Sequence, residues 1–323
     1  MVRVVRNPFY LSDAQATATP SRQDGITETE EFIQRAYGCE MIQECGILLK
    51  LSQVVMATGQ VFFHRFYHRC SLAKYNHIWL AAACLFLACK VEEQLRRLRD
   101  VVSVVYYCFT KRETGDGKLL DVYGAQGYEW KTEVVKAERF LLKELGFHTG
   151  VEHPHKFILV YINTLRSHSG VDAGDAHWKS FLQRAWNYAN DMLRTDLCCR
   201  VAPECIACGC IYLAAKDCGI PLPEGTVQWW QVFEVDREGI LLVENTAKRI
   251  YQMEKLAGKY VDWTRRIGKR RREEEHISST KSSHVDISTQ DARESSPSPP
   301  SSHRYTSRPS SKTRHHHHHH YRT

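Results

Sequence analysis

The 323-residue sequence has none of the short signatures that usually mark a catalytic or nucleotide-binding site. It has no GxGxxG or P-loop pattern, no GxSxG nucleophile motif and no HExxH zinc motif. No apolar run approaches the roughly 20 residues that a membrane-spanning helix needs, because Lys90 ends the most apolar segment. We therefore expect neither a common type of enzyme, nor a cofactor, nor a membrane protein.

A secretory signal is also lacking, since Arg3, Arg6 and Asn7 interrupt the apolar residues at the start of the chain. We therefore expect a reducing compartment and free thiols at the 12 cysteines, most of which lie in apolar helical runs. Cys205 and Cys208 form a CxxC pair, but no second Cys or His pair follows at zinc-finger spacing, so we expect no metal site.

The excess positive charge is confined to the C-terminal end. Residues 264–323 hold 13 Lys and Arg but only six Asp and Glu, while the preceding residues carry 31 charges of each sign. A folded domain that binds nucleic acid through its phosphates needs a concentrated basic face. The neutral body therefore predicts no direct DNA binding.

Beyond Thr264 the composition changes to Ser, Thr, Pro, His and Arg, which cannot bury enough apolar surface to fold. We predict a disordered tail at 259–323, in which the hexahistidine run at 315–320 is either a tag or native. A basic cluster near the start of the tail is typical of a nuclear import signal, the alternative being a solvated charge run. Its members are Arg265, Arg266, Lys269, Arg270, Arg271 and Arg272.

Apolar residues at helical spacing dominate residues 28–257, and no stretch has convincing strand alternation, so the predicted fold class is all-α. After an N-terminal arm at 1–27, we predict helices at 28–51, 54–69, 76–91, 101–110 and 129–145. A second series starts at Pro154, with predicted helices at 155–165, 178–193, 207–216, 227–235 and 237–257.

The two series contain an internal repeat. AAACLFLACK at 81–90 and ACGCIYLAAK at 207–216 are identical at five of ten positions with a constant offset of 126 residues. The helices also follow in a similar order. We therefore predict two related domains, at 28–150 and 151–258.

Glu138 is the most informative single residue. It lies within the apolar face of its helix, because Val134 precedes it by four positions and Leu141 follows by three. A carboxylate there must be paired or lie at a rim. It is either part of a structural ion pair or, together with Lys90, half of a partner-binding site, in which the ammonium donates to backbone carbonyls and the carboxylate accepts from amides.

Several long motifs, in order, resemble the cyclin family, and within it the transcriptional L-type cyclins, with the K-type and T-type next. They are PSRQDGITETE at 20–30, MATGQVFFHRFY at 56–67, RRLRDVV at 96–102, VEHPHKFILVY at 151–161 and AWNYANDMLRTDL at 185–197. The similarity extends over residues 7–257.

The resemblance implies two tandem five-helix cyclin boxes that activate a cyclin-dependent kinase. Lys90 and Glu138 match the residues that contact the kinase's mobile regulatory helix, and Glu93, Arg96 and Arg97 match the adjoining interface. It further implies a non-catalytic subunit in the nucleus, a transcriptional kinase partner of the PITSLRE type, and action with RNA polymerase II or the splicing machinery.

The sequence departs from the family at two places. Residues 38–45 read GCEMIQEC in place of the MRAIL-type motif that docks substrates in cell-cycle cyclins, and the tail has only scattered Ser and Arg in place of a long Arg-Ser region. Two other functions remain open. A general transcription factor that uses tandem cyclin folds to bind promoter complexes would need an N-terminal zinc ribbon and a basic second repeat, and the sequence shows neither. A thiol or zinc enzyme would need a reactive cysteine.

Overall fold

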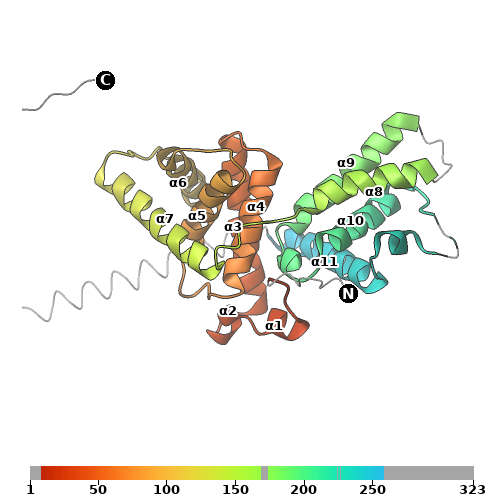
Figure 1. The fold of residues 1–323 in the computed structure, drawn as a ribbon. Helices are drawn as coiled ribbons and strands as arrows, with labels where there is room; N and C mark the ends of the chain where they lie inside the picture. The colour runs from red at the N-terminus through yellow and green to blue at the C-terminus, as the bar shows by residue number, and fades with distance from the viewer. Residues whose placement is uncertain (1–8, 169–173, 224, 226, 258–323) are drawn as a thin grey trace, which may run out of the picture. The chain divides into compact units, whose positions relative to one another are not determined.

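The computed structural model describes residues 9–168, 174–223, 225 and 227–257, and this part of the chain is helical without any strand (Figure 1). The prediction of an all-α fold is therefore confirmed. No helix within these ranges combines the length and the apolar character of a membrane span. The predicted disordered tail at 259–323, with its basic cluster, lies outside the described residues.

Between residues 9 and 150, the structure describes seven α-helices in chain order. They are α1 (Asp13–Thr17), α2 (Pro20–Gln23), α3 (Glu28–Leu48), α4 (Gln53–Tyr67), α5 (His77–Val91), α6 (Leu98–Thr114) and α7 (Ala125–Glu144). The five long ones correspond to the five helices predicted at 28–145.

The described residues from 151 to 257 form four α-helices and two short 3-10 helices. They are α8 (Pro154–His168), α9 (Gly174–Met192), η1 (Asp196–Cys199), α10 (Pro203–Cys218), η2 (Trp229–Phe233) and α11 (Arg237–Ala257). The helix predicted at 227–235 is the short 3-10 helix η2, in a segment that also holds Pro221, Pro223 and Gly225.

Local sequence explains where the key helices begin and end. Thr27 and Glu30 form a capping box at the start of α3, with the Thr27 hydroxyl accepting from the Glu30 amide and the Glu30 carboxylate accepting from the Thr27 amide. Gly146 follows α7 with a φ of +58°, and Phe147 donates its amide to the Leu142 carbonyl at 3.1 Å. This is a Schellman motif, which stops α7 soon after Glu138.

Each half is built around one buried helix. α5 lies at the centre of the first core and packs against α3, α4, α6 and α7, and its side chains from Leu80 to Leu85 are at most 2% exposed (Figure 1). α10 has the same role in the second core, where α8, α9 and α11 surround it. The repeated sequences at 81–90 and 207–216 are therefore the central helices of two similar bundles.

The two cores meet along α4. Ala57 and Val61 on α4 form a small apolar cluster with Leu193, and the ring of His64 lies 3.1 Å from the Leu193 carbonyl oxygen. The amide of Leu11 also donates to the Cys199 carbonyl at 2.9 Å, so the N-terminal arm contacts the second core.

Candidate functional site

Lys90 and Glu138 are joined directly. The Lys90 ammonium lies 2.6 Å from Oε1 of Glu138, linking the last turn of α5 to the middle of α7. The Glu138 side chain is only 10% exposed, whereas that of Lys90 is 43% exposed. The pair thus has one buried and one accessible end, and the ammonium can reach a partner at the surface.

The aromatic ring of Phe86 supports this geometry. It lies one turn before Lys90 on α5, and the ammonium sits 4.1 Å from its ring centre, in a cation–π contact. Val134 and Leu141, one turn to either side of Glu138 on α7, are fully buried. Packing of these apolar and aromatic neighbours therefore holds both charged side chains in place.

The segment after α5 is tied to the turn between α3 and α4. Gln94 donates to the Ser52 hydroxyl at 2.7 Å and accepts from the Ser52 amide at 3.0 Å. The Arg96 guanidinium donates to the carbonyls of Leu49 and Lys50 at 3.1 and 3.2 Å. Arg96 therefore caps the end of α3, which is a structural role that the sequence did not indicate.

Glu93 and Arg97 are exposed on either side of Arg96. Glu93 has a φ of +56°, which is unusual for a residue with a side chain and turns the chain sharply away from α5. Arg97 is the N-cap residue of α6, and its side chain makes no cap hydrogen bond. The five residues matched by resemblance thus lie at the end of α5, in the segment after it and on α7, a surface that we call the rim. Lys90 and Glu138 form an ion pair there, and Glu93 donates its amide to the Lys90 carbonyl at 3.3 Å.

Exposed apolar side chains adjoin this rim, and sequence reasoning missed them. Leu95 is 71% exposed, and Ile47 and Leu48 at the end of α3 are 60% and 48% exposed. The hydrogen bonds from Arg96 hold the two segments together. Periodicity could not identify these residues, because the same helical spacing also marks core positions.

A hydrogen-bond chain connects the rim to the second core. Glu92, the C-cap of α5, accepts from the Thr58 hydroxyl at 2.6 Å, and His153 contacts the same hydroxyl at 2.8 Å. Burial lowers the pKa of His153 to about 4, so its ring is neutral at physiological pH. The hydroxyl donates to the carboxylate, and the ring can therefore donate to the hydroxyl through Nε2.

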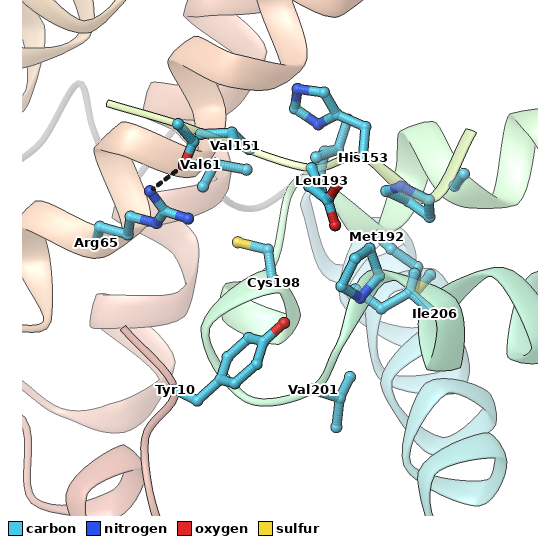
Figure 2. Close-up of a pocket in the computed structure, with 15 residues that line it drawn as sticks. Tyr10, Val61, Arg65, Val151, His153, Met192, Leu193, Cys198, Val201 and Ile206 are labelled. Atoms are coloured by element: carbon cyan, nitrogen blue, oxygen red, sulfur yellow. Dashed lines mark hydrogen bonds between the residues drawn. The ribbon is translucent and has the colours of Figure 1, made fainter. Parts of the chain in front are cut away.

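A cavity of about 110 Å³ lies where the two cores meet (Figure 2). Arg65 reaches it from α4, is 4% exposed, donates to the Gly150 carbonyl at 3.3 Å and stacks over the ring of Phe9 at 4.2 Å. His153 and Cys198 line the same cavity. Arg65 thus anchors both the linker between the cores and the N-terminal arm.

The cysteines do not form a chemical centre in the described residues. Cys205, Cys208 and Cys210 are buried on α10, and burial raises the pKa of each thiol, that of Cys205 to about 12. Protonated thiols are poor metal ligands and poor nucleophiles. No group of three or more His, Cys, Asp or Glu side chains in this part of the chain is placed to hold a metal ion.

Comparison with known proteins assigns the fold. Residues 9–150 match the family model described as "Cyclin, N-terminal domain". The chain is 45% identical over 255 residues to Cyclin-L1-1 of Arabidopsis thaliana, covering 79% of this chain and 59% of that protein. It is 42% identical over 248 residues to Cyclin-L1 of Homo sapiens, covering 76% and 45%. The chain thus spans about half the length of the curated relatives it matches.

Solved structures share the fold at lower identity. A chain of the yeast RNA Pol II CTD kinase CTDK-1 complex aligns with a TM-score of 0.55 at 17% identity, covering 72% of this chain and 69% of that chain. A chain of the yeast TFIIK complex aligns with a TM-score of 0.54 at 17% identity, covering 75% and 96%. These solved structures show that the chain shares their fold, while the family model and the L-type relatives show that the chain is similar to the cyclins.

Proposed function

We propose that this cyclin is the activating subunit of a cyclin-dependent kinase that acts in RNA polymerase II transcription and pre-mRNA splicing. The proposed partner is a transcriptional kinase of the PITSLRE type, and the proposed wider partners are RNA polymerase II and the splicing machinery. The chain itself performs no chemistry. Its two boxes are assigned to residues 28–150 and 151–258.

The observation that carries the proposal is the Lys90–Glu138 pair at the half-exposed end of α5. An ammonium and a carboxylate side by side can satisfy free carbonyl and amide groups at the end of a partner's helix. The exposed side chains of Leu95, in the segment after α5, and of Ile47 and Leu48, at the end of α3, add apolar area. A surface of this kind suits a helix of a partner protein better than a small substrate.

Activation would occur by a shift between kinase conformations. A protein kinase is active when a lysine in its sheet pairs with a glutamate on its regulatory helix. A cyclin that binds the kinase only when that helix is in its inward position raises the population of the active kinase. The size of the shift depends on how much more tightly the cyclin binds the inward than the outward position. The rim formed by Lys90, Glu93, Arg97 and Glu138 is the surface proposed to hold the helix there.

Capture of the kinase from cell extract tests this assignment. Wild type, Lys90→Ala and Glu138→Ala would be immobilised, and the bound kinase and its phosphorylation of polymerase tail peptides would be measured. Lys136→Ala is the matched control, because Lys136 lies on the same helix and pairs with Glu133 at 2.6 Å on the exposed side. Loss of kinase in both site variants but not in the control supports the proposal, whereas equal capture by all four proteins refutes it.

A nuclear location is proposed from the basic cluster at 265–272, which follows the described part of the chain. A fluorescent fusion of the full chain should accumulate in nuclei. Replacing the six basic residues of the cluster with alanine should distribute it between nucleus and cytoplasm, and unchanged nuclear accumulation would assign import to another signal or to the kinase partner.

A further inference from the structure

The second box repeats the charged pair of the first. Lys216 in the last turn of α10 lies 3.1 Å from Oε1 of Glu244 on α11, just as Lys90 on α5 pairs with Glu138 on α7. The exposed fractions also agree, since the Lys216 and Glu244 side chains are 54% and 10% exposed. The repeat therefore reproduces an accessible ammonium above a buried carboxylate.

The surroundings of the second pair match as well. Tyr212 lies one turn before Lys216, with its ring centre 5.0 Å from the ammonium, in the position that Phe86 takes in the first box. Ile240 and Ala247 flank Glu244 by the same four and three positions as Val134 and Leu141 flank Glu138, and both are buried. An aromatic ring, an ammonium and a carboxylate thus recur as a unit.

One difference frees the second lysine for a partner. Glu244 also forms an ion pair with Lys248, one turn further along α11, at 3.1 Å. Burial alone would raise the pKa of Glu244, but hydrogen bonds from Lys216 and Lys248 hold it below its ordinary value. Lys216 can therefore move to another acceptor without leaving a buried carboxylate unpaired.

A groove of about 780 Å³ opens beside Lys216, between the end of α10, η2 and the start of α11. Its lining includes the apolar side chains of Leu222 and Leu241, the indole of Trp230 and the guanidinium of Arg237. Arg237 makes no ion pair with any described residue. No carboxylate is among the described residues that line the groove, which offers the Arg237 guanidinium, the exposed side of the Lys216 ammonium that also pairs with Glu244, and a wide apolar surface.

We propose that this groove is a second docking site, which binds an acidic peptide segment with aromatic or aliphatic side chains from a partner protein. Lys216 and Arg237 bind its carboxylates and backbone carbonyls, while its apolar side chains lie against Trp230 and Leu241. Charge complementarity selects this occupant, because a basic or neutral peptide would bring no carboxylate to Arg237 or to the exposed side of Lys216. The site lies in the other box from Lys90 and does not depend on kinase activation.

Fluorescence anisotropy with the full chain tests the site directly. The probe is a fluorescein-labelled peptide in which Asp and Glu alternate with Leu and Phe, and the comparison peptide carries Lys and Arg at the acidic positions. Wild type should bind the acidic peptide about tenfold more tightly than the basic one, and the difference should shrink as salt is added. Lys216→Ala and Arg237→Ala should each weaken binding roughly threefold, as loss of an exposed ion pair does.

Lys90→Ala is the matched control, since it removes the equivalent lysine of the first box and should leave peptide affinity unchanged. Both Lys216 and Arg237 are exposed, and circular dichroism would confirm that their variants fold. Equal binding of the two peptides, or variants that bind like wild type, would overturn the proposal. Kinase capture by Lys216→Ala should equal that of wild type, so a failure here is distinct from a failure of kinase binding.

Discussion

Replacing both members of the Lys90–Glu138 pair with apolar side chains should separate kinase binding from stability. Removing Lys90 alone leaves the Glu138 carboxylate between Val134 and Leu141, with its side chain only 10% exposed. Breaking a fully buried ion pair costs about 3–5 kcal/mol. Because Lys90 is 43% exposed and water can replace it, we expect a cost of roughly 1–2 kcal/mol for Lys90→Met.

The double variant Lys90→Met/Glu138→Leu should recover that loss. Apolar residues of similar volume often replace an ion pair at no cost, so the double variant should unfold within about 1 kcal/mol of wild type. Lys90→Met alone should lower Tm by about 2–8 °C, and the double variant should restore it. It should nevertheless fail to capture the kinase, because neither carbonyl nor amide groups of the kinase helix find a partner.

The assay is a double-mutant cycle measured by chemical denaturation, with kinase capture measured on the same four proteins. Two results would refute the reasoning. If the double variant is less stable than either single variant, the pair contributes to stability. If the double variant captures kinase like wild type, the pair does not take part in kinase binding.

Three further predictions concern stability and thiol chemistry. Burial lowers the pKa of His64 to about 3, so below the ordinary pKa of 6.5 the unfolded chain binds a proton that the folded chain does not. The free energy of unfolding should therefore fall by about 1.5 kcal/mol between pH 6.5 and 5 because of this residue. His64→Gln should make the free energy of unfolding less dependent on pH, as denaturation series across that range would show. Only Cys198 and Cys218 are partly exposed among the cysteines, so a thiol reagent should modify these two first and the others only on unfolding, as peptide mapping would show. A Cβ on Gly209 would lie 2.5 Å from Cβ of Val243, so Gly209→Ala should lower the free energy of unfolding by about 1–3 kcal/mol, measured by urea titration.

The sequence predicted the first charged pair for a physical reason. Apolar positions at helical spacing determine which face of α7 turns inward, and Glu138 lies in the middle of that face. The same spacing buries α5 on nearly all sides, so its charged end must emerge at the rim. Two helices packed side by side then leave little freedom, and Lys90 and Glu138 meet at 2.6 Å.

The second pair could not be found in the same way. Lys90 and Glu138 are 48 residues apart, whereas Lys216 and Glu244 are 28 apart. The first box places the whole of α6 between its two helices, and the second has only the short η2 there. A comparison at a constant offset of 126 residues therefore aligns Lys90 with Lys216 but does not align Glu138 with Glu244. Only the packing of α10 against α11 restores the correspondence.

Other features depended on contacts that no local pattern encodes. Arg96 looked like an exposed interface residue, yet its guanidinium caps α3 through the carbonyls of Leu49 and Lys50, nearly fifty residues earlier. Leu95 lies between α5 and α6, where helical spacing gives no information, and it is 71% exposed. After the positive φ of Glu93, hydrogen bonds from Gln94 to Ser52 and from Arg96 to Leu49 hold this segment against the turn after α3.

Reconstitution with a purified PITSLRE-type kinase tests the central claim most directly. Phosphorylation of a polymerase tail peptide would be measured as the cyclin is titrated into a fixed amount of kinase. We predict saturable activation by wild type and by the control Lys136→Ala, and activation weakened at least about tenfold by Lys90→Ala and Glu138→Ala, as expected for residues at the centre of an interface. Equal activation by all four proteins, or none by wild type, would contradict the account.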